Sequence, residues 1–134
     1  MTRIEDLKIK INEELTSLKK ATNAIACSVL DKDGFIIYYN KDDHLNDDSF
    51  KKKIVRLFTT LETLKIINFY EKTEYISFKD VKDEIDLYTN GFKILIKSFS
   101  ENLILITIFE FVENIDDVLP IFNDAIDNLS NYIL

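Results

Sequence analysis

The sequence predicts an α/β fold, an α+β sandwich in which one five-stranded antiparallel sheet carries helices on both faces. Apolar residues recur at helical spacing at the beginning, in the middle and at the end of the chain, and shorter apolar or alternating runs lie between them. Turn residues at 31–34 (Asp-Lys-Asp-Gly) and 90–91 (Asn-Gly) separate two pairs of these runs. The resulting order is α-β-β-α-β-β-β-α, which we expect residues 1–134 to form as a single domain.

The chain is predicted to open with an amphipathic helix and a β-hairpin. Over residues 3–20, apolar residues recur every three or four positions with Lys, Glu and Asn between them. Residues 24–30 are almost entirely apolar, which is typical of a strand buried on both faces. The turn at 31–34 then connects this strand to a second strand at 35–39.

A second helix is predicted over residues 50–67, after a polar loop at 40–49. The loop ends at an N-cap residue, which is Asn46, Asp47 or Ser49. The first half of this helix is basic, which opposes a helix dipole that prefers anions near its N-terminus. These cations form either a binding face or a row of solvated side chains; they are Lys51, Lys52, Lys53 and Arg56.

Three further strands are expected in the second half of the chain. Residues 85–90 and 92–97 alternate in polarity on either side of the Asn-Gly turn, as in a half-exposed hairpin. Residues 103–109 are apolar on both faces of the strand that they would form. The stretch 75–78 is either a short extra strand or a packed loop.

The burial patterns of these strands predict their order in the sheet. The two strands that are apolar on both faces, 24–30 and 103–109, should be central and covered by helices on each side. The strands that carry polar side chains, 35–39 and 85–90, should lie towards the edges. With the strands numbered along the chain, the order 2-1-5-4-3 satisfies these constraints.

A third helix is predicted to close the chain. Apolar residues recur at helical spacing from Val118 to Ile133. Pro120 lacks a backbone donor and is tolerated in the first turn of a helix, where the donors are unpaired in any case. We therefore expect this helix to begin near Asp116 or Asp117.

The net charge of −7 lies entirely at the C-terminal end of the chain. Residues 98–134 hold seven acids and no base, so the other 24 − 7 = 17 acids balance the 17 bases of residues 1–97. This excess repels a phosphate backbone and disfavours nucleic acid as a partner. It either attracts a basic patch on a protein partner or keeps the surface solvated. The acids are Glu101, Glu110, Glu113, Asp116, Asp117, Asp124 and Asp127.

The sequence disfavours membrane insertion and catalysis. No apolar run approaches the ~20 residues of a spanning helix, and the single cysteine, Cys27, is expected to be a buried thiol in a cytoplasmic protein. The single histidine, His44, lies in a hydrophilic loop, which is typical of a surface residue. Both glycines fall in predicted turns, so neither contributes to a phosphate-binding loop. We therefore expect a non-enzymatic protein without catalytic, cofactor-binding or metal-binding residues.

The predicted arrangement resembles the roadblock / dynein light chain-like family. The resemblance rests on the strand-turn-strand of residues 24–39, the helix at 50–67, the three-stranded meander at 85–109 and the closing helix. It implies a dimer, with itself or with a related roadblock-like chain, in which the second helices pack together and the third strands join. It also implies a small GTPase that the protein regulates or scaffolds. The abundance of Ile, Lys and Asn, with two glycines in all, resembles proteins of AT-rich genomes, and an archaeal member of this family is one source that it suggests.

A longin- or profilin-like adaptor in vesicle traffic or the cytoskeleton is the alternative function. Such domains have a similar sheet, but a longin domain typically opens with a strand, whereas this chain opens with a helical pattern. Profilin-like sheets usually bring tryptophan and many more glycines, and this chain has no tryptophan. The sequence therefore favours the roadblock-like interaction module.

Two features of the sequence also predict dimerisation. The strand at 85–90 has neither Pro nor Lys to protect its edge, and the helix beside it is apolar on more than one face. The alternative is that residues 69–83 fold back over this edge within one chain. The predicted interface residues are Leu57, Thr60, Leu61, Leu64, Ile85, Leu87 and Tyr88.

Overall fold

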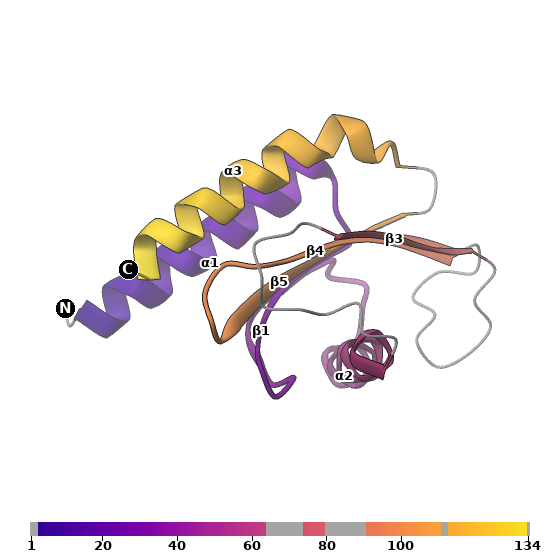
Figure 1. The fold of residues 1–134 in the computed structure, drawn as a ribbon, viewed down its shortest axis with the longest axis horizontal. Coiled ribbons are helices and arrows are strands. Elements are labelled where there is room, and N and C mark those ends of the chain that lie inside the picture. Colours follow the sequence, from indigo (N-terminus) through magenta and orange to yellow (C-terminus); the bar gives the residue numbers. More distant parts are fainter. Residues whose placement is uncertain (1–2, 64–73, 80–90, 111–112, 134) are drawn as a thin grey trace.

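The computed structural model describes residues 3–63, 74–79, 91–110 and 113–133. Its elements are α1 (Arg3–Thr22), β1 (Ala26–Asp31), β2 (Ile36–Lys41), α2 (Asp47–Thr63), β3 (Glu74–Lys79), β4 (Gly91–Ser98), β5 (Leu103–Glu110) and α3 (Ile115–Ile133). Over these described residues the fold is α+β, with three helices and one antiparallel sheet, as Figure 1 shows. Four strands lie in the order β2-β1-β5-β4, and β3 pairs with the outer side of β4.

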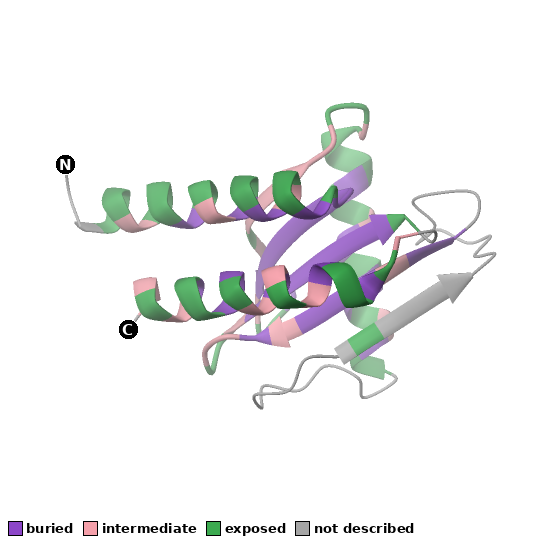
Figure 2. Ribbon diagram, turned by 90° about the horizontal axis from the view of Figure 1, so that it is seen from above, coloured by how far each residue is buried: buried purple, intermediate pink, exposed green. Residues whose placement is uncertain are grey.

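Helices cover both faces of the sheet, as the sequence predicts. α1 and α3 lie side by side and antiparallel on one face, and α2 lies alone on the other (Figure 1). The sheet divides the core into two apolar clusters, one that contains Leu15 and Phe122 beneath α1 and α3, and one that contains Ile54 beneath α2. Figure 2 shows the buried central strands below the exposed outer sides of α1 and α3.

β1 and β5 form the centre of the sheet. They pair antiparallel along their length, and each has a second neighbour, β2 beside β1 and β4 beside β5. Val29 on β1 is 1% exposed, and Ile106 and Ile108 on β5 are 0% exposed. These values confirm that the two strands with apolar residues on both faces are central.

The outer strand beside β4 is formed by residues 74–79, whereas the sequence analysis placed it at residues 85–90. β3 runs antiparallel along β4, so the stretch 75–78 is a strand and not a packed loop. Residues 85–90 lie outside the described residues. The prediction followed the strong Asn-Gly turn signal, which favours a strand directly before the turn. The residues that occupy the edge alternate only weakly in polarity and therefore gave a weaker strand signal.

β2 is an irregular strand at the other edge of the sheet. Val29 pairs with Tyr38, and Leu30 pairs with Ile36, so Ile37 is an extra residue in β2. This shift is a β-bulge, which bends a strand and interrupts its hydrogen-bond ladder. The Ile37 side chain is 44% exposed.

Asparagine side chains set the beginnings of α2 and α3. Asn46, one of the three candidate caps, accepts a hydrogen bond from the Ser49 N–H at 3.1 Å. Asn114 accepts one from the Asp116 N–H at 3.1 Å, so α3 begins directly after Asn114, earlier than predicted. Pro120 is consequently the sixth residue of α3, and the prediction that places it in the first turn is wrong.

Asp47, in the first turn of α2, connects this helix to β2. Its carboxylate lies 2.9 Å from the Lys41 Nζ and accepts a hydrogen bond from the Tyr39 hydroxyl at 3.1 Å. The hydrogen bond from Lys41, followed by that from Tyr39, holds the pKa of Asp47 below its ordinary value. The Tyr39 ring also contacts the Phe50 ring, with 5.8 Å between the centroids. An acid in this turn complements the helix dipole ahead of the basic residues that follow.

Ile106→Ala is expected to lower the free energy of unfolding by about 2–5 kcal/mol, because it leaves a cavity between β5 and α2. Urea denaturation measures this change. The control is Ile9→Ala on α1, where the side chain is 43% exposed and the expected change is within about 0.5 kcal/mol. Equal losses for the two variants would contradict the central position of β5.

The stabilising effect of Asp47 is expected to depend on pH. Because its folded-state pKa is lowered, the effect is fully present above the unfolded-state value of about 3.8 and is lost as the pH falls through the folded-state pKa. Urea midpoints of the wild-type protein and of Asp47→Asn should therefore differ at neutral pH and converge in acid. Asp48→Asn is the control, since Asp48 follows in the same turn but makes neither contact. A difference that grows on acidification would contradict the assignment.

Candidate protein-interaction surface

α2 is amphipathic, so one of its sides packs against the sheet and the other faces solvent. The side chains that it buries are Phe50, Ile54, Leu57, Phe58 and Leu61. Lys51, Lys52, Val55 and Arg56 are exposed. Val55 is 46% exposed, and it places an aliphatic group among these cations.

The turn between β1 and β2 adds an aromatic side chain. The Asp31 carboxylate accepts hydrogen bonds from the N–H groups of Asp33 and Phe35 at 2.9 and 3.0 Å, which fixes the turn. Gly34 has a φ of 88°, and a Cβ at this position would lie 2.7 Å from the Phe58 ring. Only glycine meets both conditions without strain. Phe35 follows directly and is 69% exposed, so the turn holds its ring outside the core.

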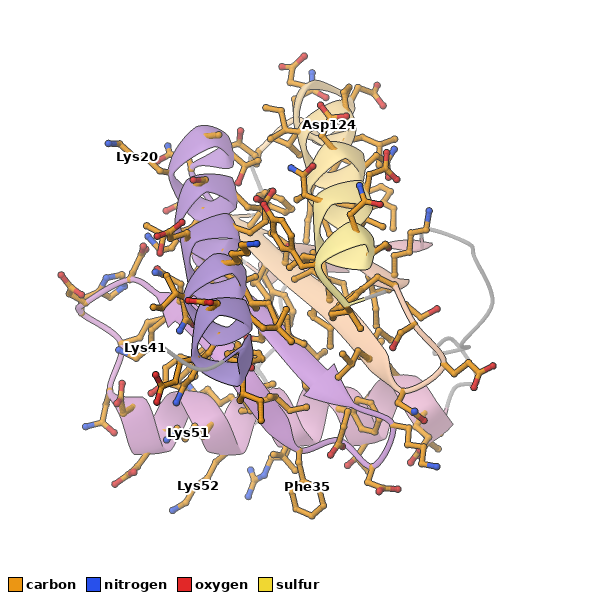
Figure 3. The ribbon with its side chains drawn as sticks, turned by 90° about the vertical axis from the view of Figure 1, so that its left-hand side faces the viewer. Lys20, Phe35, Lys41, Lys51, Lys52 and Asp124 are labelled. Carbon is orange, nitrogen blue, oxygen red and sulfur yellow. The ribbon has the colours of Figure 1, made fainter. Side chains whose placement is uncertain are left out.

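These residues form one candidate binding surface. Figure 3 shows Phe35 and Lys52 projecting to the same side of the molecule, away from the sheet. We call the exposed residues Phe35, Lys51, Lys52, Val55 and Arg56 the α2 surface. Apolar groups within a charged surround are typical of protein–protein interfaces, where an apolar centre is sealed by a polar rim. The matching partner surface would carry apolar groups and acids.

The structure places two of the predicted interface residues in the core of the chain. Leu57 is 1% exposed and Leu61 is 0% exposed, because both pack against the sheet beneath α2. Thr60 is half-buried. The remaining predicted residues lie outside the described residues; they are Leu64, Ile85, Leu87 and Tyr88. These two leucines, which the sequence analysis assigned to a contact with a second chain, therefore pack within their own chain.

The sequence analysis missed Phe35 and Val55 as surface residues. Phe35 was assigned to the strand that follows the turn, but β2 begins one residue later. Val55 lies next to the buried Ile54, and the sequence analysis did not name it. Its position between Ile54 and Arg56 could have identified Val55 as a surface residue, because this position falls on the polar side of the helix.

The acidic residues at the C-terminal end of the chain lie across the sheet from the α2 surface. On α3, the residues Asp116, Asp117, Asp124 and Asp127 are exposed. Figure 3 shows Asp124 and Lys52 on opposite sides of the molecule. The fold therefore separates a basic surface from an acidic one.

The structure places the single cysteine in the core and the single histidine at the surface. Cys27 is buried in β1, and desolvation raises the pKa of its thiol to about 12, so the thiol stays protonated at neutral pH. The exposed His44 has its Nδ1 4.0 Å from Asp42, whose carboxylate lies 2.6 Å from the Lys19 Nζ. Among the described residues, no three His, Cys, Asp or Glu side chains are grouped so that they could hold a metal ion. None of the described helices has the length and hydropathy needed to cross a membrane.

Solved structures show the same fold. No protein-family model and no curated protein matches this chain. MglB of Myxococcus xanthus matches with a TM-score of 0.62 and 18% identity, over 92% of this chain and 94% of that chain. The gliding protein MglB of Thermus thermophilus matches with a TM-score of 0.60 and 14% identity, over 92% and 87% of the two chains. A Roadblock/LC7 domain from Streptomyces avermitillis matches with a TM-score of 0.60 and 12% identity, over 87% and 94%.

These matches extend over most of the chain. Because their sequence identity is low, they are evidence about the fold alone. Together with the helices on both faces of one antiparallel sheet, they confirm at this level the resemblance that the sequence suggested. The chain therefore has the fold of MglB and of the Roadblock/LC7 domain.

Proposed function

We propose that this protein is a non-enzymatic, dimeric interaction module of the cytoplasm that binds a small GTPase and regulates or scaffolds it. The observation that carries the proposal is the α2 surface, which presents Phe35 and Val55 among cations on an MglB-like fold. The roadblock resemblance implies the class of partner. The GTPase would supply the nucleotide site, since both glycines of this chain lie in turns or at a strand start and neither belongs to a phosphate-binding loop.

The α2 surface has the composition that such a contact requires. Large side chains held rigidly outside the core are efficient binding anchors, because little conformational entropy is lost when a partner covers them. Phe35 meets this condition, since Gly34 and the Asp31 carboxylate fix the turn that carries it. Lys51 and Lys52 would steer an acidic surface of the GTPase towards this anchor.

The sheet edge at β3 supports the dimer. An edge strand with a free backbone ladder tends to pair with another chain unless it is protected. β3 pairs with β4 on one side, and Tyr75 on this strand is 49% exposed. We propose that the β3 strands of two chains join into one sheet, with Thr60 of α2 at the margin of the contact. The other chain is a second copy or a related roadblock-like chain, and Leu64, Ile85, Leu87 and Tyr88 remain predicted interface residues.

Binding of a GTPase is tested by calorimetry with small GTPases from the same genome, each loaded with GDP or with a non-hydrolysable GTP analogue. At least one is expected to bind, with an affinity that depends on the nucleotide. Val55→Asp should weaken this binding by about tenfold or more, because the contact would bury an unpaired carboxylate.

Ile9→Asp is the matched control for this measurement. Ile9 is 43% exposed on α1, on the other face of the sheet, and its substitution should leave GTPase binding unchanged. Equal weakening by both variants would contradict the assignment to α2. Micromolar binding of GTP to the isolated chain would contradict the proposed role altogether.

Light scattering across a dilution series tests the dimer. The mass is expected to be an even multiple of the 15.7 kDa chain mass, and Tyr75→Lys should halve it by placing a charge at the joined edge. Ile37→Lys is the control, since Ile37 is 44% exposed on β2 at the opposite edge. A single-chain mass at every concentration, or equal dissociation by both variants, would overturn the proposed contact.

A further inference from the structure

The turn between β4 and β5 is held in place by hydrogen bonds. The Phe99 N–H donates to the Leu103 carbonyl at 3.1 Å and closes the turn. Within it, the Asn102 N–H donates to the Ser100 hydroxyl at 3.2 Å. The Ser130 hydroxyl on α3 donates to the Phe99 carbonyl at 3.4 Å, which connects the turn to the helix. Figure 2 shows this turn beside the second half of α3.

The turn, the end of β4 and α3 border an open cavity of about 450 Å³. Sites for small molecules typically measure about 300–1,000 Å³. Lys97 lines the cavity from the face of β4 that α3 covers, because Leu95, two residues earlier, packs in the cluster beneath α1 and α3. We call it the β4–α3 cavity, and its lining includes Lys97, Phe99, Glu101, Ile126, Asp127 and Ser130.

The β4–α3 cavity is lined by charges of both signs. Lys97 is half-buried, whereas Glu101 on the turn and Asp127 on α3 are exposed. Within the described part of the chain, the ion pairs join other residues, and none includes any of these three. A ligand that pairs with all three must therefore carry one anionic group and two cationic groups. The chain beyond Lys97 has no base, so the surroundings also favour a ligand of net positive charge.

The cavity also offers apolar surface and hydroxyl groups. Ile126 is 3% exposed, and Phe99 packs against the cluster beneath α1 and α3, so both present apolar walls that are anchored in the core. The hydroxyls of Ser100 and Ser130 also line the cavity, and a hydroxyl can donate or accept a hydrogen bond. An aliphatic stem with charged groups at its ends suits this lining.

We propose that the β4–α3 cavity binds a free basic amino acid, arginine or lysine. Such a molecule carries one carboxylate, an α-ammonium group and a second cation at the end of an aliphatic stem. Lys97 binds the carboxylate, and Glu101 and Asp127 bind the two cations, so that each charge of the lining gains a partner. The aliphatic stem lies against Phe99 and Ile126.

Other classes of small ligand match the cavity less well. A nucleotide or a phosphorylated sugar would match Lys97, but Glu101 and Asp127 would repel it. A polyamine would match the two acids and would be repelled by Lys97. A neutral amino acid would leave one of the two carboxylates without a cation.

The β4–α3 cavity is separate from the α2 surface, so the proposal does not rest on GTPase binding. α3 and α2 cover opposite faces of the sheet (Figure 1). Failure of one proposal therefore leaves the other unaffected.

Nuclear magnetic resonance titrations of the isotope-labelled protein test the ligand class. L-arginine is expected to shift the amide signals of the turn and of the second half of α3, with a dissociation constant of about 0.1–1 mM. L-citrulline lacks the side-chain cation and agmatine lacks the carboxylate, so each should bind about tenfold more weakly. No shift with arginine or lysine at about 10 mM, or citrulline binding as tightly as arginine, would overturn the proposal.

Variants of the lining test the role of each charge. Lys97→Gln should weaken arginine binding by about tenfold and leave agmatine binding unchanged, because agmatine has no carboxylate for Lys97 to bind. A merely structural effect of this substitution would weaken both ligands equally and would contradict the assignment. Asp127→Asn should also weaken arginine binding by about tenfold.

Asp124→Asn and Lys20→Gln are the matched controls. Asp124 is exposed on α3, one turn before Asp127, and Lys20 is exposed on α1, and neither lines the cavity. Both variants should bind arginine as the wild type does. Weakening in the controls equal to that in Lys97→Gln and Asp127→Asn would assign the effect to net charge and overturn the site.

N-acetyl-L-arginine amide separates a free amino acid from an arginine within a protein. This compound keeps the guanidinium but has neither a carboxylate nor an α-ammonium group. It should bind about tenfold more weakly than arginine. Tighter binding than that of arginine would assign the cavity to a basic segment of a protein partner and overturn the proposal.

Discussion

The pairing of β1 with β5 is the constraint on which the rest of the structure depends. Both strands carry apolar side chains on both faces, so neither face of the sheet centre can be left in water. One helical layer is therefore needed above and another below, which assigns the apolar side of every helix to the core. What remains for recognition is the outer side of the helices, the turns, the helix ends and the two sheet edges.

The sheet also separates a basic surface of the molecule from an acidic one. Its apolar interior separates the cations of α2 from the acids of α3, and these surfaces face opposite directions. A partner with an acidic surface meets attraction on one side of the molecule and repulsion on the other, so charge alone restricts the orientation of docking. The Asp47 contacts with Tyr39 and Lys41 keep the basic end of α2 fixed to the sheet.

The layered fold and its centre could be predicted from the sequence because they depend on contrasts of polarity within short segments. Val29 and Ile106 lie in runs that are apolar on both faces, which is a strong signal. The edge was harder, since residues 74–79 alternate weakly and are held by pairing with β4, a contact distant in the sequence. The candidate site was hardest. A leucine on a helix, such as Leu61, can be buried either by a partner chain or by its own sheet, and the sequence pattern is the same in both cases. Only the tertiary packing distinguishes the two.

The bulge in β2 limits how far the sheet can grow. A strand adds to an edge by matching a continuous row of backbone donors and acceptors, and the extra residue at Ile37 breaks that row on the β2 side. Within the part of the chain that the structure describes, β3 pairs with β4 without such a shift, so its edge is the better suited of the two to extension. Joining through that edge, as proposed above, would use it in both chains and would stop at a pair. In that proposed assembly, the irregularity at Ile37 would disfavour open-ended growth of the sheet while leaving closed association available.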